Sequence, residues 1–196
     1  MRVTFVVLFT LLPVMGTAWD MAVHGPGAEP ARRLEHVSGD WALYLLLMTL
    51  TVRPLWRTAG WRSNFVWLRR TLGLMAFFYA SLHLIFFVLF ELNLDMEQLA
   101  EQVVEKPWVT LGMTAWLLLL PLAITSTTGW QRRLGRNWAR LHQLIYPATL
   151  LGALHYVWLV KKDLSTPLAL LAVSGILMGW RLWLRRRGQA SRRVPR

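Results

Sequence analysis

The 196-residue sequence contains no cysteine. This absence excludes disulfides, zinc–thiolate sites, iron–sulfur clusters, thiol nucleophiles and covalent attachment of a c-type haem. Charged residues are also scarce, because they make up 16% of the chain whereas soluble chains carry roughly 25%. Because thiolate ligands are absent, any metal chemistry must use histidine or carboxylate ligands.

Apolar residues are abundant, at 55% of the chain, and 12 residues are tryptophan. Six continuous apolar segments approach the length of roughly 20 residues that a membrane span needs. Continuous runs rather than alternation exclude a β-barrel. We therefore predict an all-α polytopic membrane bundle of six transmembrane helices, forming one domain over residues 1–196. The predicted segments are residues 3–19, 41–56, 71–90, 109–128, 141–160 and 168–183.

The charges are sorted between the connections. Arg2, the connections 53–70 and 131–140 and the tail from Arg181 hold 17 of the 22 basic residues and no acidic residue. All ten acidic residues lie in the other three connections. A soluble nucleic-acid-binding protein has no reason for this sorting, although the net charge of +12 invites that interpretation. The positive-inside rule places the basic side, and with it both termini, in the cytoplasm.

The first apolar segment has two interpretations. Arg2, the short apolar run and the small residues 16–18 are also typical of a secretory signal with its cleavage site. Retention as a first span is the prediction that we favour, and removal would leave five spans in the same orientation.

Two histidines are predicted at the same depth in the membrane. His83 lies 13 residues from Arg70, about 20 Å along a helix, and His155 lies 15 residues from Arg140, about 22 Å. The two spans run in the same direction, so both imidazoles reach one level in the outer half. Such a pair suits the two axial positions of a six-coordinate haem. The alternative is two separate hydrogen bonds between helices.

Small residues near these histidines leave room for a porphyrin or for close helix packing. They are Gly73, Ala76 and Ala80 before His83, and Ala148 and Gly152 before His155.

The inner end holds a further histidine and several arginines. His142 lies about one turn from the basic edge, and we expect it to ligate with an unnamed partner, to contact a flavin or quinone, or to cap the site. The arginines have guanidinium groups that suit haem propionates or a flavin phosphate, whereas topology and contact with anionic lipid are the simpler interpretation for any one of them. These candidate cofactor-binding residues are Arg69, Arg70, Arg132, Arg133 and Arg136.

Six stretches of the chain carry a family resemblance: residues 36–39, 69–74, 82–84, 125–135, 141–143 and 155–158. Together they resemble the MsrQ (YedZ) family, the haem-binding membrane subunits of bacterial periplasmic methionine sulfoxide reductase systems, which belong with ferric-reductase-like transmembrane domains. The likeness covers nearly the whole chain and is most specific over residues 125–158. It implies b-type haem, bound FMN, a place in the inner membrane, and electron delivery to a periplasmic MsrP-type molybdopterin reductase. Carried onto this chain, the key histidines are His83, His142 and His155.

Electrons must reach the chain from another molecule. No stretch has the pattern of an FAD- or NAD(P)H-binding domain, so we expect electrons from quinol, a free flavin or a cytosolic flavoreductase. The acidic outer connection 91–106 is either a docking surface or a solvated loop. We expect electron transfer rather than substrate chemistry on the chain itself. The alternative class is a haem-free membrane transporter or assembly protein.

Overall fold

The computed structural model describes residues 1–58, 65–161 and 163–190, and this part of the chain is helical without a strand. The predicted all-α membrane bundle is confirmed. The elements are α1 (Arg2–His24), α2 (Pro30–Thr58), α3 (Val66–Phe86), the π-helix η1 (Phe87–Glu91), α4 (Met96–Glu105), α5 (Pro107–Ile124), α6 (Thr128–Leu134), α7 (Arg136–Leu141), the 3-10 turn η2 (His142–Leu144), α8 (Ile145–Leu159) and α9 (Ser165–Ala190).

Four helical stretches of the described chain are long and apolar enough to cross a membrane: 2–24, 66–91, 107–124 and 165–184. The other two predicted spans are helical as well. However, α2 carries charged residues in its first turns, and α8 has 15 residues, which give about 22 Å against the roughly 30 Å of hydrocarbon. A count of six spans therefore remains a prediction.

The predicted fifth span does not form one helix. α7 ends at Leu141, η2 follows at His142, and α8 begins at Ile145. Pro147 explains the break, because its nitrogen has no proton to donate and its ring clashes with the carbonyl of residue 143 in a continuous helix. In the first turn of α8 the missing donor costs nothing. The connection 131–140 is likewise helical, in α6 and α7, rather than a loop.

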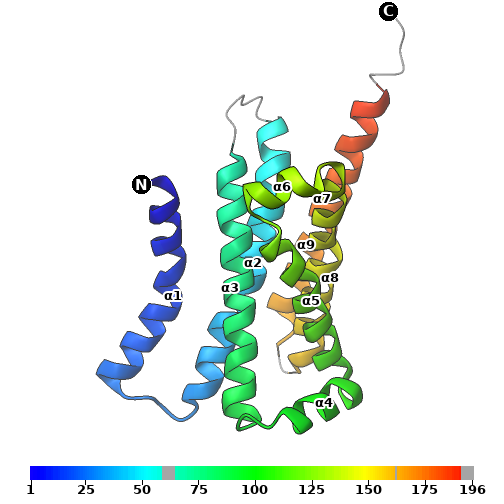
Figure 1. The fold of residues 1–196 in the computed structure, drawn as a ribbon. Coiled ribbons are helices and arrows are strands. Elements are labelled where there is room, and N and C mark those ends of the chain that lie inside the picture. Colours follow the sequence, from blue (N-terminus) through cyan, green and yellow to red (C-terminus); the bar gives the residue numbers. More distant parts are fainter. Residues whose placement is uncertain (59–64, 162, 191–196) are drawn as a thin grey trace, which may run out of the picture.

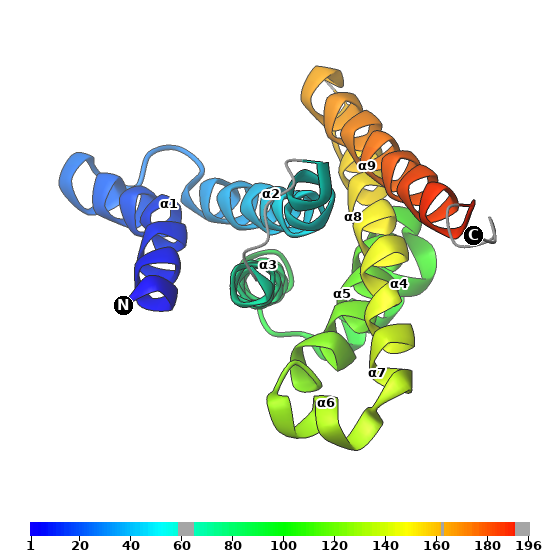
Figure 2. The same cartoon turned by 90° about the horizontal axis from the view of Figure 1, so that it is seen from above.

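The helices form two groups that meet along the middle of the bundle. α2 packs mainly on α3, with α1 beside them, whereas α8 packs on α5 and α9. Contacts of α3 with α5, and of α2 with α8 and α9, join the two groups. Figure 2 shows both groups from above. The buried core contains residues of both groups, among them Leu45, Leu50, Ala76, Tyr79 and Ala148.

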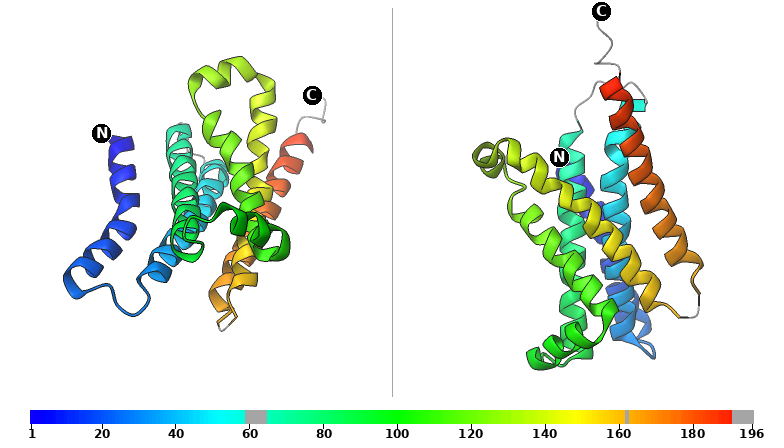
Figure 3. Two further views of the ribbon diagram at one scale, coloured as in Figure 1. Left: turned by 60° about the horizontal axis from the view of Figure 1, so that its bottom comes forward. Right: turned by 90° about the vertical axis from the view of Figure 1, so that its right-hand side faces the viewer.

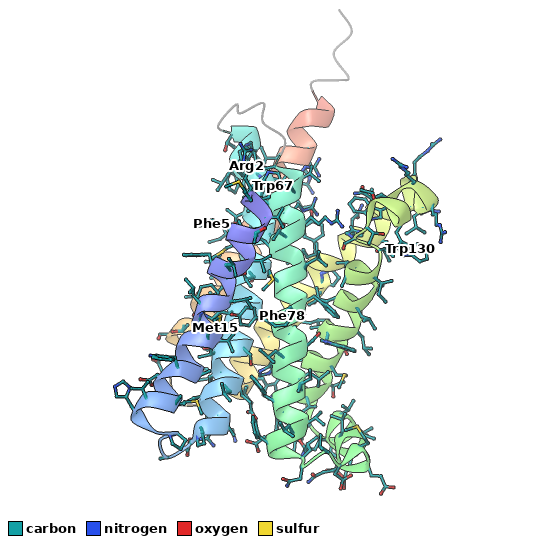
Figure 4. All side chains as sticks on the ribbon, turned by 60° about the vertical axis from the view of Figure 1, so that its left-hand side comes forward. Arg2, Phe5, Met15, Trp67, Phe78 and Trp130 are labelled. Carbon is teal, nitrogen blue, oxygen red and sulfur yellow. The ribbon has the colours of Figure 1, made fainter. Side chains whose placement is uncertain are left out.

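α1 is the least buried of the four candidate spans. One buried hydrogen bond fastens it, from the Tyr79 hydroxyl to the Thr10 carbonyl at 2.6 Å. The side chains of Phe5 and Met15 point away from the bundle, as does Phe78 on α3 (Figure 4). Such an apolar outer face is expected where lipid replaces water.

The two ends of the bundle differ. The start of α1 and the end of α9 lie toward the same end as α6 and α7, whereas α4 lies at the opposite end (Figures 1 and 3). The described residues of the basic connections and those of the acidic connections thus occupy opposite ends, which we call the inner and the outer end.

Candidate haem site

The structure brings the rings of His83 and His155 together. His83 lies in the last turn of α3 and His155 in the second half of α8. Their ring centroids are 6.2 Å apart, and the ring planes make an angle of 77°. Two residues that are 72 positions apart in the sequence therefore face one another at one level of the bundle.

Each ring is held by a backbone carbonyl of another helix, α2 for His83 and α5 for His155. The Nδ1 of His83 is 2.9 Å from the carbonyl oxygen of Glu35 on α2, and the Nδ1 of His155 is 2.6 Å from that of Trp108 on α5. A carbonyl can only accept, so Nδ1 carries the proton in both rings and each Nε2 keeps a free lone pair. This is the arrangement that orients histidines as metal ligands.

A glycine lies beside each of these carbonyls. Gly39 follows Glu35 by four residues and Gly112 follows Trp108 by four, so each glycine is one helical turn beyond the carbonyl that its histidine contacts. A Cβ atom on Gly39 would lie 3.2 Å from Cε1 and Nδ1 of His83. On Gly112 it would lie 3.0 Å from Nδ1 of His155. The missing side chains are what allow both rings to reach the backbone.

The spacing of the rings fits one iron. Two imidazole–metal bonds of about 2 Å put the coordinating nitrogens about 4 Å apart, and each ring centre lies about 1 Å behind its nitrogen. The expected separation of the centres, about 6 Å, matches the observed 6.2 Å. No cluster of three or more histidine, aspartate or glutamate side chains forms among the described residues, and two axial ligands do not require one.

The small residues near the histidines have different roles. Ala76 and Ala148 are fully buried. A Cβ atom on Gly73 would meet the Thr49 side chain of α2, so this position serves close packing of two helices. Beside Gly152 no atom lies within 4 Å of such a Cβ, which leaves room next to His155.

Aromatic residues continue from the paired histidines toward the inner end. Trp116 on α5 donates from Nε1 to the Ser81 hydroxyl on α3 at 3.0 Å. Its ring stacks on Phe77 at 6.0 Å between centroids. These contacts join α3 and α5 on the inner side of the paired histidines.

His142 is not part of the histidine pair. It lies in η2 at the inner end, where its ring stacks on Trp138 at 4.0 Å between centroids and its Nδ1 is 3.2 Å from the Trp138 carbonyl. Trp138 in turn donates from Nε1 to the carbonyl of Thr125. His142 is thereby fixed between α7 and the end of α5.

The candidate arginines separate into two kinds. Arg70, Arg132, Arg133 and Arg136 are exposed, and the guanidinium of Arg133 lies over the ring of Trp130. Arg69 is half-buried and close enough to interact electrostatically with Arg181 and Tyr146.

Arg181 is a buried residue that the sequence did not single out. It is 7% exposed and donates to the Tyr146 hydroxyl at 2.6 Å. The sequence pattern showed it only as the first residue of a basic tail, and the contact with α8 is visible only once the helices are placed.

Glu35, whose backbone carbonyl contacts His83, also carries a carboxyl group on the outer side of this site. Its Oε1 is buried and has no hydrogen-bond partner among the described residues. Burial, followed by the nearby charge of Glu91, raises the pKa of Glu35 from 4.5 to about 6. Folding therefore favours the protonated carboxyl, and this contribution to stability is lost as the pH rises from about 4.5 through about 6.

We expect Glu35→Gln to raise the apparent Tm at pH 7 and to flatten its decline between pH 4.5 and pH 7, because the amide keeps the shape without the charge. Thermal scans in one detergent across this pH range measure the effect. Glu97→Gln, at an exposed carboxyl of α4, is the matched control and should leave the pH profile unchanged. Identical profiles for Glu35→Gln and the unaltered protein would contradict the assignment.

Comparison with known proteins identifies the family of this chain. The family of ferric-reductase-like transmembrane components matches residues 38–153. A protein of Xanthomonas campestris pv. campestris is 51% identical over 159 residues, covering 81% of this chain and 72% of the relative. One from Caulobacter vibrioides is 42% identical over 184 residues, covering 93% and 87%. Both are named protein-methionine-sulfoxide reductase heme-binding subunit MsrQ.

The chain belongs to the ferric-reductase-like transmembrane family, and within that family to the MsrQ haem-binding subunits. It is a multi-pass bacterial membrane protein.

Proposed function

We propose that this chain is the haem b electron-transfer subunit of a methionine sulfoxide reductase system in the bacterial inner membrane. It passes electrons outward to a periplasmic MsrP-type molybdopterin reductase, which repairs oxidised periplasmic proteins. The observation that carries the proposal is the pair of imidazoles on α3 and α8, with free Nε2 atoms and a centroid separation of 6.2 Å. The names of the relatives, as heme-binding subunits of such a reductase, support it.

His83 and His155 are the residues that would hold the haem. When bound, the haem supplies reversible one-electron transfer without a proton or a substrate bond. The carbonyls of Glu35 and Trp108 hold the rings in one orientation, and the fixed rings limit the reorganisation that a change of charge requires. The apolar helices around them exclude water.

The inner end is where we place the entry of electrons. His142, fixed on Trp138, is the histidine nearest to this face. FMN rests on the family resemblance, and its phosphate requires cationic donors. Arg69, beside Arg181 and Tyr146, together with Arg70, Arg132, Arg133 and Arg136, supplies them at this end. The donor is the quinone pool or a cytosolic flavoreductase.

Purification of the full chain after haem-replete expression tests the proposal. We expect at least one haem b per chain by pyridine haemochrome analysis, and a Soret band that shifts on reduction with dithionite. Extraction of flavin from the same sample tests the FMN assignment separately. A colourless preparation would contradict the electron-transfer function and favour a haem-free membrane protein.

A further inference from the structure

The outer connection, expected as a loop, contains the helix α4. The Asp95 side chain caps it by accepting a hydrogen bond from the backbone amide of Gln98 at 2.9 Å. Leu99 and Val103 are partly buried, and the helix packs on α5 at the outer end of the bundle (Figure 3). The rest of its surface is free for another contact.

The exposed side of α4 has an apolar and an acidic stripe. Met96, Ala100 and Val104 recur every four residues, and so do Glu97, Glu101 and Glu105, one position later; all six are exposed. Met96 is 55% exposed and Val104 is 85% exposed. Among the described residues, none of these carboxylates takes part in an ion pair.

The turn before α4 adds an apolar side chain to this surface. Asn93 and Leu94 have positive φ angles of 49° and 64°, a backbone conformation that costs free energy for residues other than glycine. The Leu94 amide donates to the Val88 carbonyl, which fixes the turn. The Leu94 side chain is nevertheless 62% exposed. We call Leu94 together with the two stripes the α4 surface.

The helix α4 is connected through α5 to the site of the paired histidines. The Thr110 hydroxyl on α5 donates to the carbonyl of Val103 on α4. Two residues earlier, the Trp108 carbonyl holds the ring of His155. A protein bound to α4 would therefore lie over the outer end of the helix that positions one of the paired histidines.

We propose that the α4 surface is the docking site of the soluble electron acceptor, and that the acceptor presents an apolar patch beside basic residues. The inference rests on the function proposed above and names the place and chemistry of the contact. An apolar centre flanked by charge is typical of specific interfaces. Helices that lie on lipid are instead rich in lysine and arginine, and a second copy would bring like charges together.

Charge reversal tests the site. Glu97→Lys/Glu101→Lys changes the charge by the same amount as the control Glu29→Lys/Asp163→Lys, whose positions are exposed on other outer connections. The dithionite-reduced, haem-loaded protein is mixed with purified MsrP-type reductase in a stopped-flow instrument. At low ionic strength we expect reoxidation to slow at least about tenfold for the α4 variant, with the difference shrinking at high salt. The control should stay within about twofold.

Glu97→Gln/Glu101→Gln is a second, milder variant in case the charge reversal impairs folding, because it removes the two charges without adding new ones. It should keep the haem spectrum, slow reoxidation less than the reversal, and weaken the salt dependence. Wild-type rates and salt dependence in both haem-loaded variants would overturn the docking site. If the unaltered protein binds no haem or does not reduce the reductase, the proposed function fails instead, and this is seen before any variant is compared.

A fluorescent label on α4 distinguishes binding of the partner protein from contact with lipid. Because the chain has no cysteine, Val104→Cys introduces a unique labelling position. The emission of an environment-sensitive label should be the same in detergent and in nanodiscs and should shift to the blue when the MsrP-type reductase is added. A blue shift on transfer to nanodiscs alone would place α4 in lipid and overturn the proposal.

Discussion

His83→Ala and His155→Ala should each lower the low-spin haem bound per chain at least about tenfold, because either change removes one of two imidazoles that face a single site. The Nδ1 atoms of both rings contact backbone carbonyls, and His142 lies at the inner end, away from the pair. Haem quantification and the optical spectrum of the reduced protein measure the effect.

His36→Ala and His142→Ala are the controls for these two variants. His36 lies near the start of α2 and His142 in η2, both outside the pair, so the low-spin spectrum should persist. If His83→Ala or His155→Ala instead kept a normal bis-histidine spectrum, the pairing of these two histidines would be wrong.

Gly112→Ala should weaken haem retention by about tenfold or more without a direct change of ligand. The new Cβ atom would lie 3.0 Å from Nδ1 and 3.1 Å from Cε1 of His155, closer than side chains normally approach. The ring must then shift away from the Trp108 carbonyl, and both its orientation and its tautomer lose their restraint. Haem loss to an external haem-binding protein, followed optically, measures the change.

Gly175→Ala is the matched control for Gly112→Ala. It lies in α9, where no atom comes within 4 Å of the added Cβ, and alanine favours a helix by about 1 kcal/mol over glycine. We expect unchanged haem retention and an equal or slightly higher Tm. Equal retention in the Gly112 and Gly175 variants would show that the close approach of Gly112 to His155 does not position the ring.

The pairing of the histidines is the part of the site that the sequence predicts best. Counting residues outward from Arg70 and Arg140 gives equal depths because the rise per residue of a helix is nearly constant. The structure places the two rings together, although this count ignored the break at His142. The break lies on the inner side of His155. It therefore changes which helix carries His155, but not the depth of this residue in the bundle.

Gly39, Gly112 and the buried Arg181 could not be found in the same way. Each acts through a neighbouring helix, and a single sequence does not say which helices are neighbours. Gly39 lies in one of the stretches that resemble the MsrQ family, but nothing in its spacing connects it to His83. The family resemblance indicated where to look, whereas the placement of α2 beside α3 shows what the glycine contacts.

The sequence also contains features that are typical of a helix at α4. Asp95 followed by Gln98 is typical of a helix start, and the residues from Met96 to Val104 alternate with a helical period. From the sequence, the connection 91–106 is predicted as a docking surface or a solvated loop, because five acidic residues lie between positions 91 and 105.

Electron paramagnetic resonance of the oxidised, haem-loaded protein tests the shared iron most directly. Ring planes 77° apart leave two iron d orbitals nearly equal in energy, so we predict a low-spin ferric signal of large anisotropy that disappears in His83→Ala and in His155→Ala. A purely high-spin signal would mean that at most one imidazole binds the iron, and it would contradict the account.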